Sequence, residues 1–264
     1  MKAMKLTVAA AVVALSGLAA FGEKADEDWL QQTNGLAKAA AVKASDKLPD
    51  VFIMGDSISL GYTPFVQKKL AGEANVTRVP GNCGPSQFYL AEMKAWLGDR
   101  HYAVIHVNFG IWDNHYIKGD AGGMGLYWGR EITEALPPVA KGTAIRDLGF
   151  RIRTPVDVYA KNLRTILAFV KTHADKVVFG LTTPLKSWQG DDRCGRIRCY
   201  NEIACAICRE MGVAVDDLYA VAERHLDDQG DGCHFGAKGC DALADAVVES
   251  VRAALKEPPP PKKD

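Results

Sequence analysis

The chain has 264 residues, of which 48% are hydrophobic and 24% charged, with 25 glycines and 12 prolines. This composition is ordinary for a globular protein, and it excludes collagen-like, coiled-coil and wholly disordered chains. The 32 Lys and Arg residues balance the 32 Asp and Glu residues, so the basic excess that phosphate binding needs is absent. We therefore exclude nucleic acid as a main partner and expect small molecules or neutral polymers instead.

Residues 1–22 have the three-part pattern of a secretory signal peptide. Lys2 and Lys5 precede an apolar run, and small residues follow at Ala19 and Ala20. The run is short for a membrane span, and no later stretch is apolar enough to be one. We expect a cleaved signal peptide and a periplasmic or secreted protein without stable membrane insertion. The alternative is an uncleaved N-terminal anchor.

Short apolar runs alternate with amphipathic stretches along the rest of the chain. The first run, 48–55, ends in Gly55 and is typical of a parallel strand buried on both faces. Further strands are predicted at 76–79, 102–108, 176–181 and 213–215, and helices at 64–71, 86–97 with Ser86 as N-cap, 155–173, 200–211 and 237–255. This alternation predicts a three-layer α/β fold around a parallel sheet, with the functional site at the carboxyl ends of the strands.

The domain boundaries follow from the same pattern. Residues 23–47 are predicted to be a leader or surface helix, 48–256 the folded domain, and 257–264, EPPPPKKD, a disordered tail. The Gly-rich stretch 114–154 is much longer than a normal connection between a strand and a helix. Because it carries Trp128 and several arginines, we expect a substrate-shaping lid, the alternative being a loose excursion.

The seven cysteines matter because exported thiols tend to pair. Two local pairs are candidates for disulfides, although sequence does not fix connectivity: Cys194 with Cys199, and Cys233 with Cys240. Cys205 and Cys208 lie three residues apart in a helical pattern, as some metal ligands do. No second pair containing His has zinc-site spacing, so we expect disulfides or buried thiols and no metal.

The motif GDSIS begins at Gly55 and follows the first predicted strand. A serine at the carboxyl end of a central strand, at a turn into a helix, exposes its hydroxyl and leaves its backbone N–H free to hold an oxyanion. Ser57 is therefore a candidate nucleophile. The alternative is a Ser or Asp that only caps the helix.

The motif DGCHF, residues 231–235, precedes the last predicted helix. A serine hydroxyl is a weak nucleophile until a base removes its proton, and histidine suits that task near neutral pH. His234 is the candidate base, and Asp231, three residues earlier, is placed to orient the ring and stabilise the imidazolium.

GDSIS after the first strand and DGCHF before the last helix together resemble the SGNH, or GDSL-type, hydrolases. The resemblance covers about residues 48–255. It implies a flavodoxin-like sheet of about five strands, Ser57 as nucleophile, His234 as base, Asp231 as orienting acid, and no metal or organic cofactor.

The resemblance also implies an oxyanion hole that includes the N–H of Ser57. In NCGPS the family's backbone glycine matches Gly84. The family's third block, Gly-x-Asn-Asp, appears here with Trp112 where the Asn is expected. Because losing one oxyanion donor costs about 3 to 4 kcal/mol of transition-state stabilisation, we expect a replacement in Asn108, with Trp112 and Asn114 as alternatives.

These observations predict an exported serine esterase that hydrolyses short acyl esters, with acetyl groups on carbohydrate as the favoured substrate. The substrate-binding candidates are Trp112, Asp113 and Trp128. One alternative is a lysophospholipase or thioesterase acting on longer acyl chains, which needs an apolar groove. Another is a glycan-binding protein that keeps the scaffold without catalysis. The sequence does not fix the oligomeric state.

Overall fold

The computed structural model describes residues 47–118, 150–190 and 192–258. Five parallel strands form its main sheet, in the order β2-β1-β3-β6-β7. This flavodoxin-like order confirms the predicted α/β fold. The strands are β1 (Asp50–Met54), β2 (Asn75–Arg78), β3 (Tyr102–Asn108), β6 (Ala174–Gly180) and β7 (Ala214–Asp216).

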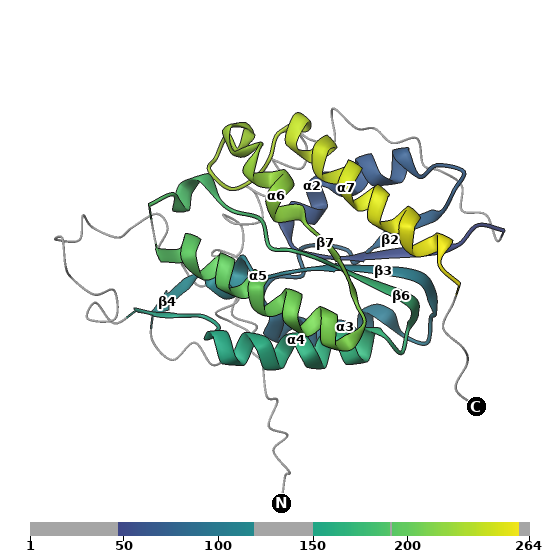
Figure 1. The fold of residues 1–264 in the computed structure, drawn as a ribbon, viewed down its shortest axis with the longest axis horizontal. Coiled ribbons are helices and arrows are strands. Elements are labelled where there is room, and N and C mark those ends of the chain that lie inside the picture. The colour runs from purple at the N-terminus through teal and green to yellow at the C-terminus, as the bar shows by residue number, and fades with distance from the viewer. Residues whose placement is uncertain (1–46, 119–149, 191, 259–264) are drawn as a thin grey trace, which may run out of the picture.

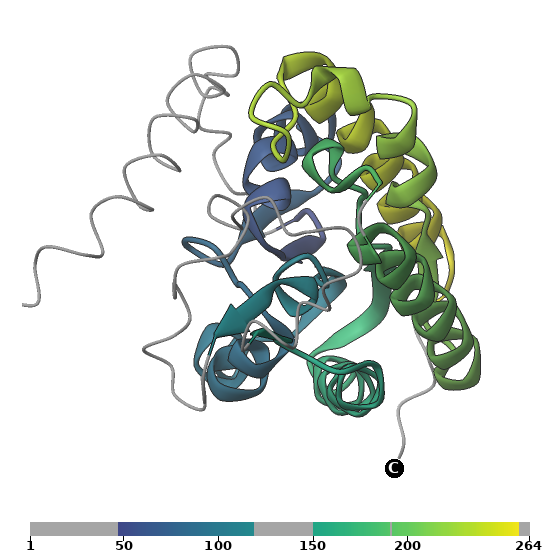
Figure 2. The same cartoon turned by 90° about the vertical axis from the view of Figure 1, so that its left-hand side faces the viewer.

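Helices cover both faces of the sheet (Figure 1). Helices α2, α6 and α7 lie on one face, and α3, α4 and α5 lie on the other, which the perpendicular view also shows (Figure 2). The three layers place the carboxyl ends of all five strands along one edge. The helices are α2 (Ser57–Lys69), α3 (Ser86–Leu97), α4 (Val156–Val170), α5 (Asp192–Met211), α6 (Leu218–Glu223) and α7 (Ala237–Lys256).

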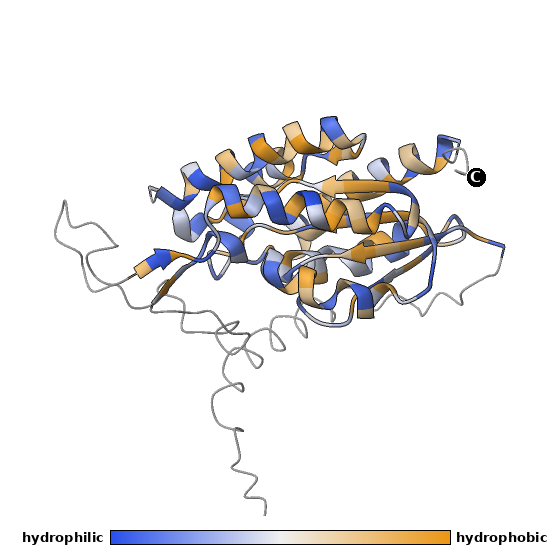
Figure 3. Cartoon of the chain, turned by 90° about the horizontal axis from the view of Figure 1, so that it is seen from below, coloured by the Kyte–Doolittle hydropathy of each residue, from blue (hydrophilic) through white to orange (hydrophobic). Residues whose placement is uncertain are grey.

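The central strands are buried on both faces because their side chains alternate between two cores. In β1, Val51 and Ile53 belong to the core under α2 and α7, whereas Phe52 and Met54 belong to the core under α3 and α4. Figure 3 shows the strands as hydrophobic and the helices as mixed, with polar residues among the apolar ones. Burial on both faces explains why these strands appear in the sequence as continuous apolar runs.

The predicted strands match the observed ones to within about two residues. Two helices, α2 and α5, begin earlier than predicted. Helix α2 begins at Ser57 because Asp56 caps it, accepting a hydrogen bond from the Ile58 N–H at 3.0 Å. The prediction of Ser86 as an N-cap is wrong, since α3 begins at Ser86 and Pro85 occupies the cap position. The side chain of Ser86 instead donates to a carboxylate described below.

The two ends of the predicted insertion pair with each other. Strands β4 (Tyr116–Lys118) and β5 (Phe150–Ile152) form an antiparallel ribbon at the end of the molecule where β3 finishes. The intervening segment with Trp128 lies outside the described residues, as do residues 1–22, almost all of 23–47 and the end of the tail. A lid role for 114–154 stays a prediction.

The two predicted disulfides are not formed. Cys194 and Cys199 lie on α5 five residues apart, about 140° around the helix, which points their side chains in different directions. The Cys194 thiol donates to the Trp188 carbonyl at 2.8 Å, and the Cys240 thiol donates to the Phe235 carbonyl at 3.3 Å. Among the helices of the described residues, none is both long and apolar enough to cross a membrane.

Candidate active site

The turn after β1 brings a serine hydroxyl to the carboxyl edge of the sheet. Gly55 makes this turn, and a Cβ there would lie 2.6 Å from the Cβ and Oγ of Ser59, so only glycine fits without displacement. Asp56 then caps α2, and Ser57 is the first residue of the helix, with 6% of its surface exposed. The backbone N–H of Ser57 therefore lies in the first turn, where α-helices leave their N–H groups unpaired.

The loop before α7 folds around a carboxylate. Oδ1 of Asp231 accepts hydrogen bonds from the backbone N–H groups of Cys233, at 2.8 Å, and His234, at 2.7 Å. Gly232 has a φ of +87°, a conformation that glycine adopts without strain. This tight turn directs Oδ2 of the same carboxylate at Nδ1 of His234, at 2.7 Å.

The two motifs meet across 177 residues of sequence. Nε2 of His234 lies 2.9 Å from Oγ of Ser57, within hydrogen-bond distance. Together with the contact between Asp231 and Nδ1, this gives an unbroken line of carboxylate, imidazole and hydroxyl. The structure thus brings together the three side chains that the sequence predicted as nucleophile, base and orienting acid.

The surroundings of Asp231 favour the ionised form of its carboxyl group. Burial alone would raise its pKa, but hydrogen bonds from the His234 ring and from the two backbone N–H groups outweigh this and hold its pKa well below the usual range. A charged carboxylate accepting from Nδ1 fixes the tautomer in which Nε2 is the proton acceptor that faces Ser57.

Gly84 lies in the loop that leads from β2 to α3, with a φ of +56° and its residue buried. Its N–H donates to Oδ1 of Asn82 at 2.8 Å, which closes a turn within the loop. The N–H that the sequence assigned to the oxyanion hole is therefore engaged by a neighbouring side chain.

Arg78, at the end of β2, ties this loop to the nucleophile turn. One guanidinium nitrogen, Nη1, donates to the Gly81 carbonyl at 3.0 Å. The other, Nη2, donates to the Gly55 carbonyl at 3.2 Å and to Ser59 Oγ at 3.0 Å. The backbone N–H of Cys83 also donates to the Gly55 carbonyl, at 3.2 Å. The sequence gives no signal for Arg78, because no pattern in it shows that the guanidinium group reaches both segments.

The amide of Asn108 faces the neighbouring strand. Its Nδ2 donates to the carbonyls of Gly180, at 2.9 Å, and Leu181, at 3.3 Å, and the residue is 2% exposed. Both amide hydrogens are thus used to hold β3 against the end of β6. An oxyanion role for Asn108 stays a prediction, and it requires the amide to exchange one of these two hydrogen bonds.

Asp113 is a buried anchor. Its two carboxylate oxygens accept from the N–H of Ser86, at 3.0 Å, and from the hydroxyl of Ser86, at 2.5 Å, while Asn162 donates to the same hydroxyl at 2.9 Å. Burial raises the pKa of Asp113, opposed by these hydrogen bonds. With 0% of its surface exposed, Asp113 fixes the start of α3, and its contact with a substrate stays a prediction.

The other two predicted residues of this block have their own neighbours. Asn114 donates from Nδ2 to the Arg193 carbonyl at 2.8 Å and accepts from Nε of Arg196 at 2.7 Å, so its amide serves packing within the protein. The ring of Trp112 meets the His115 ring edge-on at 5.3 Å, and the Arg153 guanidinium lies 5.9 Å from its centre. Trp112 is partly exposed and stays a predicted substrate contact.

Asp56 is a second carboxyl group near the nucleophile. It is 1% exposed; Oδ1 caps α2, and Oδ2 has no hydrogen-bond partner. Burial raises its pKa to about 6, although the Ile58 N–H, His234 and Arg78 each lower it. The sequence motif predicts only a helix cap at this position, because it does not show that the second carboxyl oxygen is buried.

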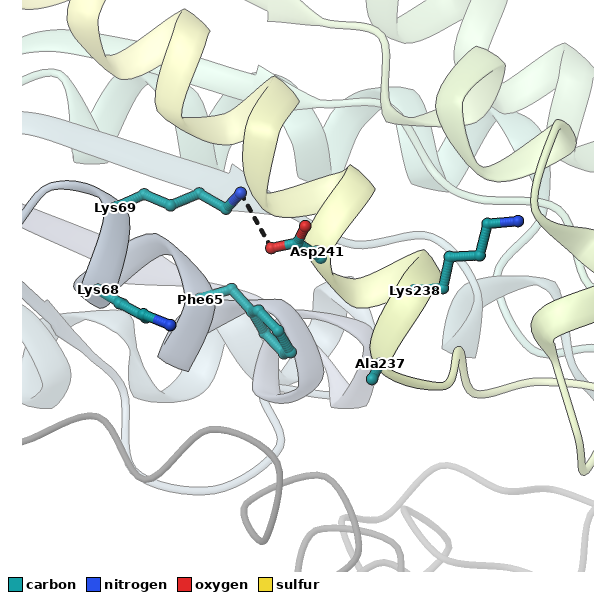
Figure 4. Close-up of a pocket in the computed structure, with 6 residues that line it drawn as sticks. All are labelled: Phe65, Lys68, Lys69, Ala237, Lys238 and Asp241. Atoms are coloured by element: carbon teal, nitrogen blue, oxygen red, sulfur yellow. Dashed lines mark ion pairs between the residues drawn. The ribbon is translucent and has the colours of Figure 1, made fainter.

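A surface hollow of about 580 Å³ lies between α2 and α7 (Figure 4). An ion pair of 2.9 Å between Lys69 and Asp241 crosses it. The hollow is lined by Phe65, Lys68, Lys69, Ala237, Lys238 and Asp241. The side chains of Ser57, His234 and Asp231 are not among them.

The described residues contain no group of three or more His, Cys, Asp or Glu side chains that is arranged to hold a metal ion.

Comparison with known proteins gives a result for structure only. No family model matches the sequence, and no curated protein matches it. The lipase/acylhydrolase from Enterococcus faecalis is 17% identical, with 82% of this chain and 100% of that chain covered at a TM-score of 0.58. An acetylxylan esterase from Geobacillus stearothermophilus is 12% identical, with 80% and 95% covered at 0.55. A GDSL-like lipase from Bacteroides thetaiotaomicron is 14% identical, with 87% and 98% covered at 0.56.

The chain has the SGNH hydrolase fold. At these identities the likeness establishes the fold, in agreement with what the resemblance of the two motifs implied. Because a fold can host several activities, the chemistry of this SGNH-fold protein has to be argued from its site.

Proposed function

We propose that this protein is a serine esterase that hydrolyses short acyl esters outside the cytoplasm, with acetylated carbohydrate as its substrate class. The observation that carries the proposal is the line from Asp231 to His234 to Ser57, with contacts of 2.7 and 2.9 Å. A hydroxyl, an imidazole and an ionised carboxylate in this order form a nucleophile with its base and orienting acid.

In the first half-reaction, Oγ of Ser57 attacks the ester carbonyl carbon while its proton passes to Nε2 of His234. The carbonyl π electrons move to oxygen and give a tetrahedral oxyanion. Its collapse expels the alcohol, which takes the proton from His234, and leaves the acyl group on Ser57. The ionised Asp231 stabilises the imidazolium that exists between these two proton transfers.

In the second half-reaction, a water molecule replaces the alcohol. His234 accepts a proton from the water, whose oxygen attacks the acyl carbon and forms a second oxyanion. Collapse of that intermediate releases the carboxylic acid and returns the proton to Ser57 Oγ. The N–H of Ser57, in the first turn of α2, is the proposed backbone donor to both oxyanions. Gly84 adds its N–H only by sharing or exchanging the bond that it makes with Asn82.

The substrate class rests on three further considerations. The predicted signal peptide supports a location outside the cytoplasm, and the predicted insertion contains Trp128 and several arginines, which suit recognition of a polar substrate. Two of the similar structures are described as an acetylxylan esterase and a lipase/acylhydrolase. The first description supports short acyl groups on glycans, and the second supports the alternative of longer acyl chains.

The test is hydrolysis of p-nitrophenyl acetate, butyrate and octanoate by the mature wild type, by Ser57→Ala and by a matched control, Ser187→Ala. Ser187 is an exposed serine whose backbone N–H donates to the Gly232 carbonyl at 2.9 Å, and alanine keeps that backbone contact. We expect acetate to be the best substrate, with activity retained in Ser187→Ala and reduced to background in Ser57→Ala.

Three results would contradict parts of this proposal. Equal rates in the wild type and Ser57→Ala would exclude Ser57 as nucleophile. A preference for octanoate would favour the lysophospholipase or thioesterase alternative. Tight binding of a glycan with no turnover of any ester would indicate the non-catalytic binding protein.

A further inference from the structure

The oxyanion side of the site lacks its expected donors in this structure. The Gly84 N–H is engaged by Asn82, the Asn108 amide is engaged by the end of β6, and Trp112 occupies the position of the family's Asn. If the protein is the serine esterase proposed above, its tetrahedral intermediate needs a donor besides the N–H of Ser57. The following inference rests on that proposed function.

Asn82 has an amide donor that no described group uses. Its Oδ1 accepts from the Gly84 N–H, and because a backbone N–H can only donate, this contact fixes which end of the amide is oxygen. Nδ2 is therefore the opposite end, and it is buried without a hydrogen-bond partner. Since buried donors are nearly always paired, an unpaired one in a loop that contacts the turn before the nucleophile points to a group that pairs with a ligand.

The loop that carries Asn82 is fixed next to the nucleophile. On one side of Asn82, the Gly81 carbonyl accepts from Arg78, and on the other side the Cys83 N–H donates to the Gly55 carbonyl. Arg78 also reaches Gly55, which lies two residues before Ser57. Asn82 is thus held between two anchored neighbours, against the turn that presents the nucleophile.

The contact with Gly84 also strengthens the donor. When Oδ1 of an amide accepts a hydrogen bond, the amide is polarised and its N–H₂ group becomes a better donor. The same contact restricts rotation of the side chain, so that little reorganisation accompanies formation of the oxyanion.

We propose that Asn82 is a catalytic residue whose Nδ2 donates to the substrate oxyanion, in place of the amide missing at Trp112. On this account the Gly84 N–H serves the oxyanion hole indirectly, by holding Asn82 in position. Trp112 is then tolerated because the donor comes from the loop after β2 instead of the loop after β3.

Two variants separate this role from a purely structural one. Asn82→Asp keeps an oxygen for the Gly84 N–H but removes the Nδ2 donor, and Asn82→Ala removes the donor without adding charge. We expect kcat for p-nitrophenyl acetate to fall about 10²- to 10³-fold in both variants, with KM within about threefold of the wild type. The Tm of Asn82→Asp should stay close to that of the wild type, because the turn is retained.

The inference requires kcat to fall in both variants. A fall in Asn82→Asp alone could come from charge repulsion, and a fall in Asn82→Ala alone could come from loss of the turn. If either variant keeps kcat within about threefold of the wild type, the inference is overturned. In that case Ser57-dependent turnover by the wild type leaves the esterase proposal standing. If the wild type shows no Ser57-dependent turnover, the esterase proposal fails and the role of Asn82 fails with it.

Discussion

Two groups of residues lie around Ser57: Asp231 and His234, here called the triad side, and the candidate donors to the oxyanion, here called the oxyanion side. They differ in how many of their hydrogen bonds are already formed within the protein. On the triad side, Asp231, His234 and Ser57 are already joined by short contacts, and every polar atom of the Asp231 carboxylate has a partner. On the oxyanion side, the Gly84 N–H and the Asn108 amide are used by other groups, and Asn82 keeps an unpaired donor.

This difference follows from when each side acts. The base and its carboxylate must be oriented before the substrate arrives, so their contacts exist within the protein. The oxyanion exists only during the reaction, and its donors gain their partner at that moment. Groups that are fully paired at rest, such as the Asn108 amide, are therefore poor candidates for the oxyanion side.

The largest effect is expected from removing the base. His234→Ala should lower kcat about 10⁴- to 10⁶-fold, because the hydroxyl of Ser57 then has no group to take its proton. His101→Ala is the control, since His101 is 56% exposed and pairs with Asp175 on the surface. Comparable steady-state rates in the two variants would show that the triad side does not carry the reaction.

The orienting acid should come next. Asp231→Asn removes the charge that fixes the ring, and kcat should fall about 10⁴-fold at neutral pH. Since the pKa of Asp231 is depressed, its carboxylate loses its charge only in strongly acidic solution, well below the pH at which an acidic limb of kcat/KM is measured. An acidic limb of kcat/KM that is present in the wild type and absent in Asp231→Asn would show that Asp231 titrates in that range, and would contradict its depressed pKa.

The fold and the triad side could be largely predicted from the sequence because their signals are local. Residues 48–55 alternate between two cores and therefore form a continuous apolar run, and Asp231 reaches His234 through a turn of four residues. The start of α2 was missed because Gly61 and Pro64 weaken its helical pattern, while the Asp56 cap and packing against α7 hold it in place.

The oxyanion side could not be predicted in the same way. Whether the Asn108 amide faces a substrate or the carbonyls of Gly180 and Leu181 depends on how β3 and β6 pack, which the motif does not encode. The same holds for Asn82, whose unpaired end becomes visible only once its partner Gly84 is placed. The role of Arg78 likewise depends on two segments that are distant in sequence.

Arg78→Lys should weaken the oxyanion side and leave the triad contacts in place. An ammonium group cannot span the carbonyls of Gly81 and Gly55 as the guanidinium fork does, so the loop with Asn82 should shift. A displacement of this kind lowers kcat by up to about 10²-fold. Arg100→Lys is the control, because the Arg100 side chain is 62% exposed. Equal kcat values in the two variants would show that the Arg78 guanidinium does not hold the loop with Asn82 in its catalytic position.

The smallest expected effect is on stability. The pKa of Asp56 is raised from 3.8 to about 6, so its buried carboxyl costs stability as pH rises from about 4 to 6. Asp56→Asn keeps an oxygen for the Ile58 N–H and removes this cost. The unfolding free energy of Asp56→Asn minus that of the wild type should therefore rise between pH 4 and pH 6, by about 3 kcal/mol in total.

Urea unfolding at pH 4, 5, 6 and 7 measures this difference for Asp56→Asn. The control is Asp217→Asn, because Asp217 caps α6 in an exposed position and has no comparable burial cost. A difference between Asp56→Asn and the wild type that stays constant from pH 4 to 7 would show that burial of Asp56 does not penalise its ionised form.

The catalytic role of Ser57 is tested by covalent labelling with a fluorophosphonate, followed by intact-mass measurement and peptide mapping. The reagent phosphonylates a serine hydroxyl only where a base and an oxyanion hole activate it. We expect one adduct per chain on Ser57 in the wild type, and none in His234→Ala under the same conditions. An adduct on a different residue, or ester hydrolysis that continues after Ser57 is fully labelled, would contradict this role.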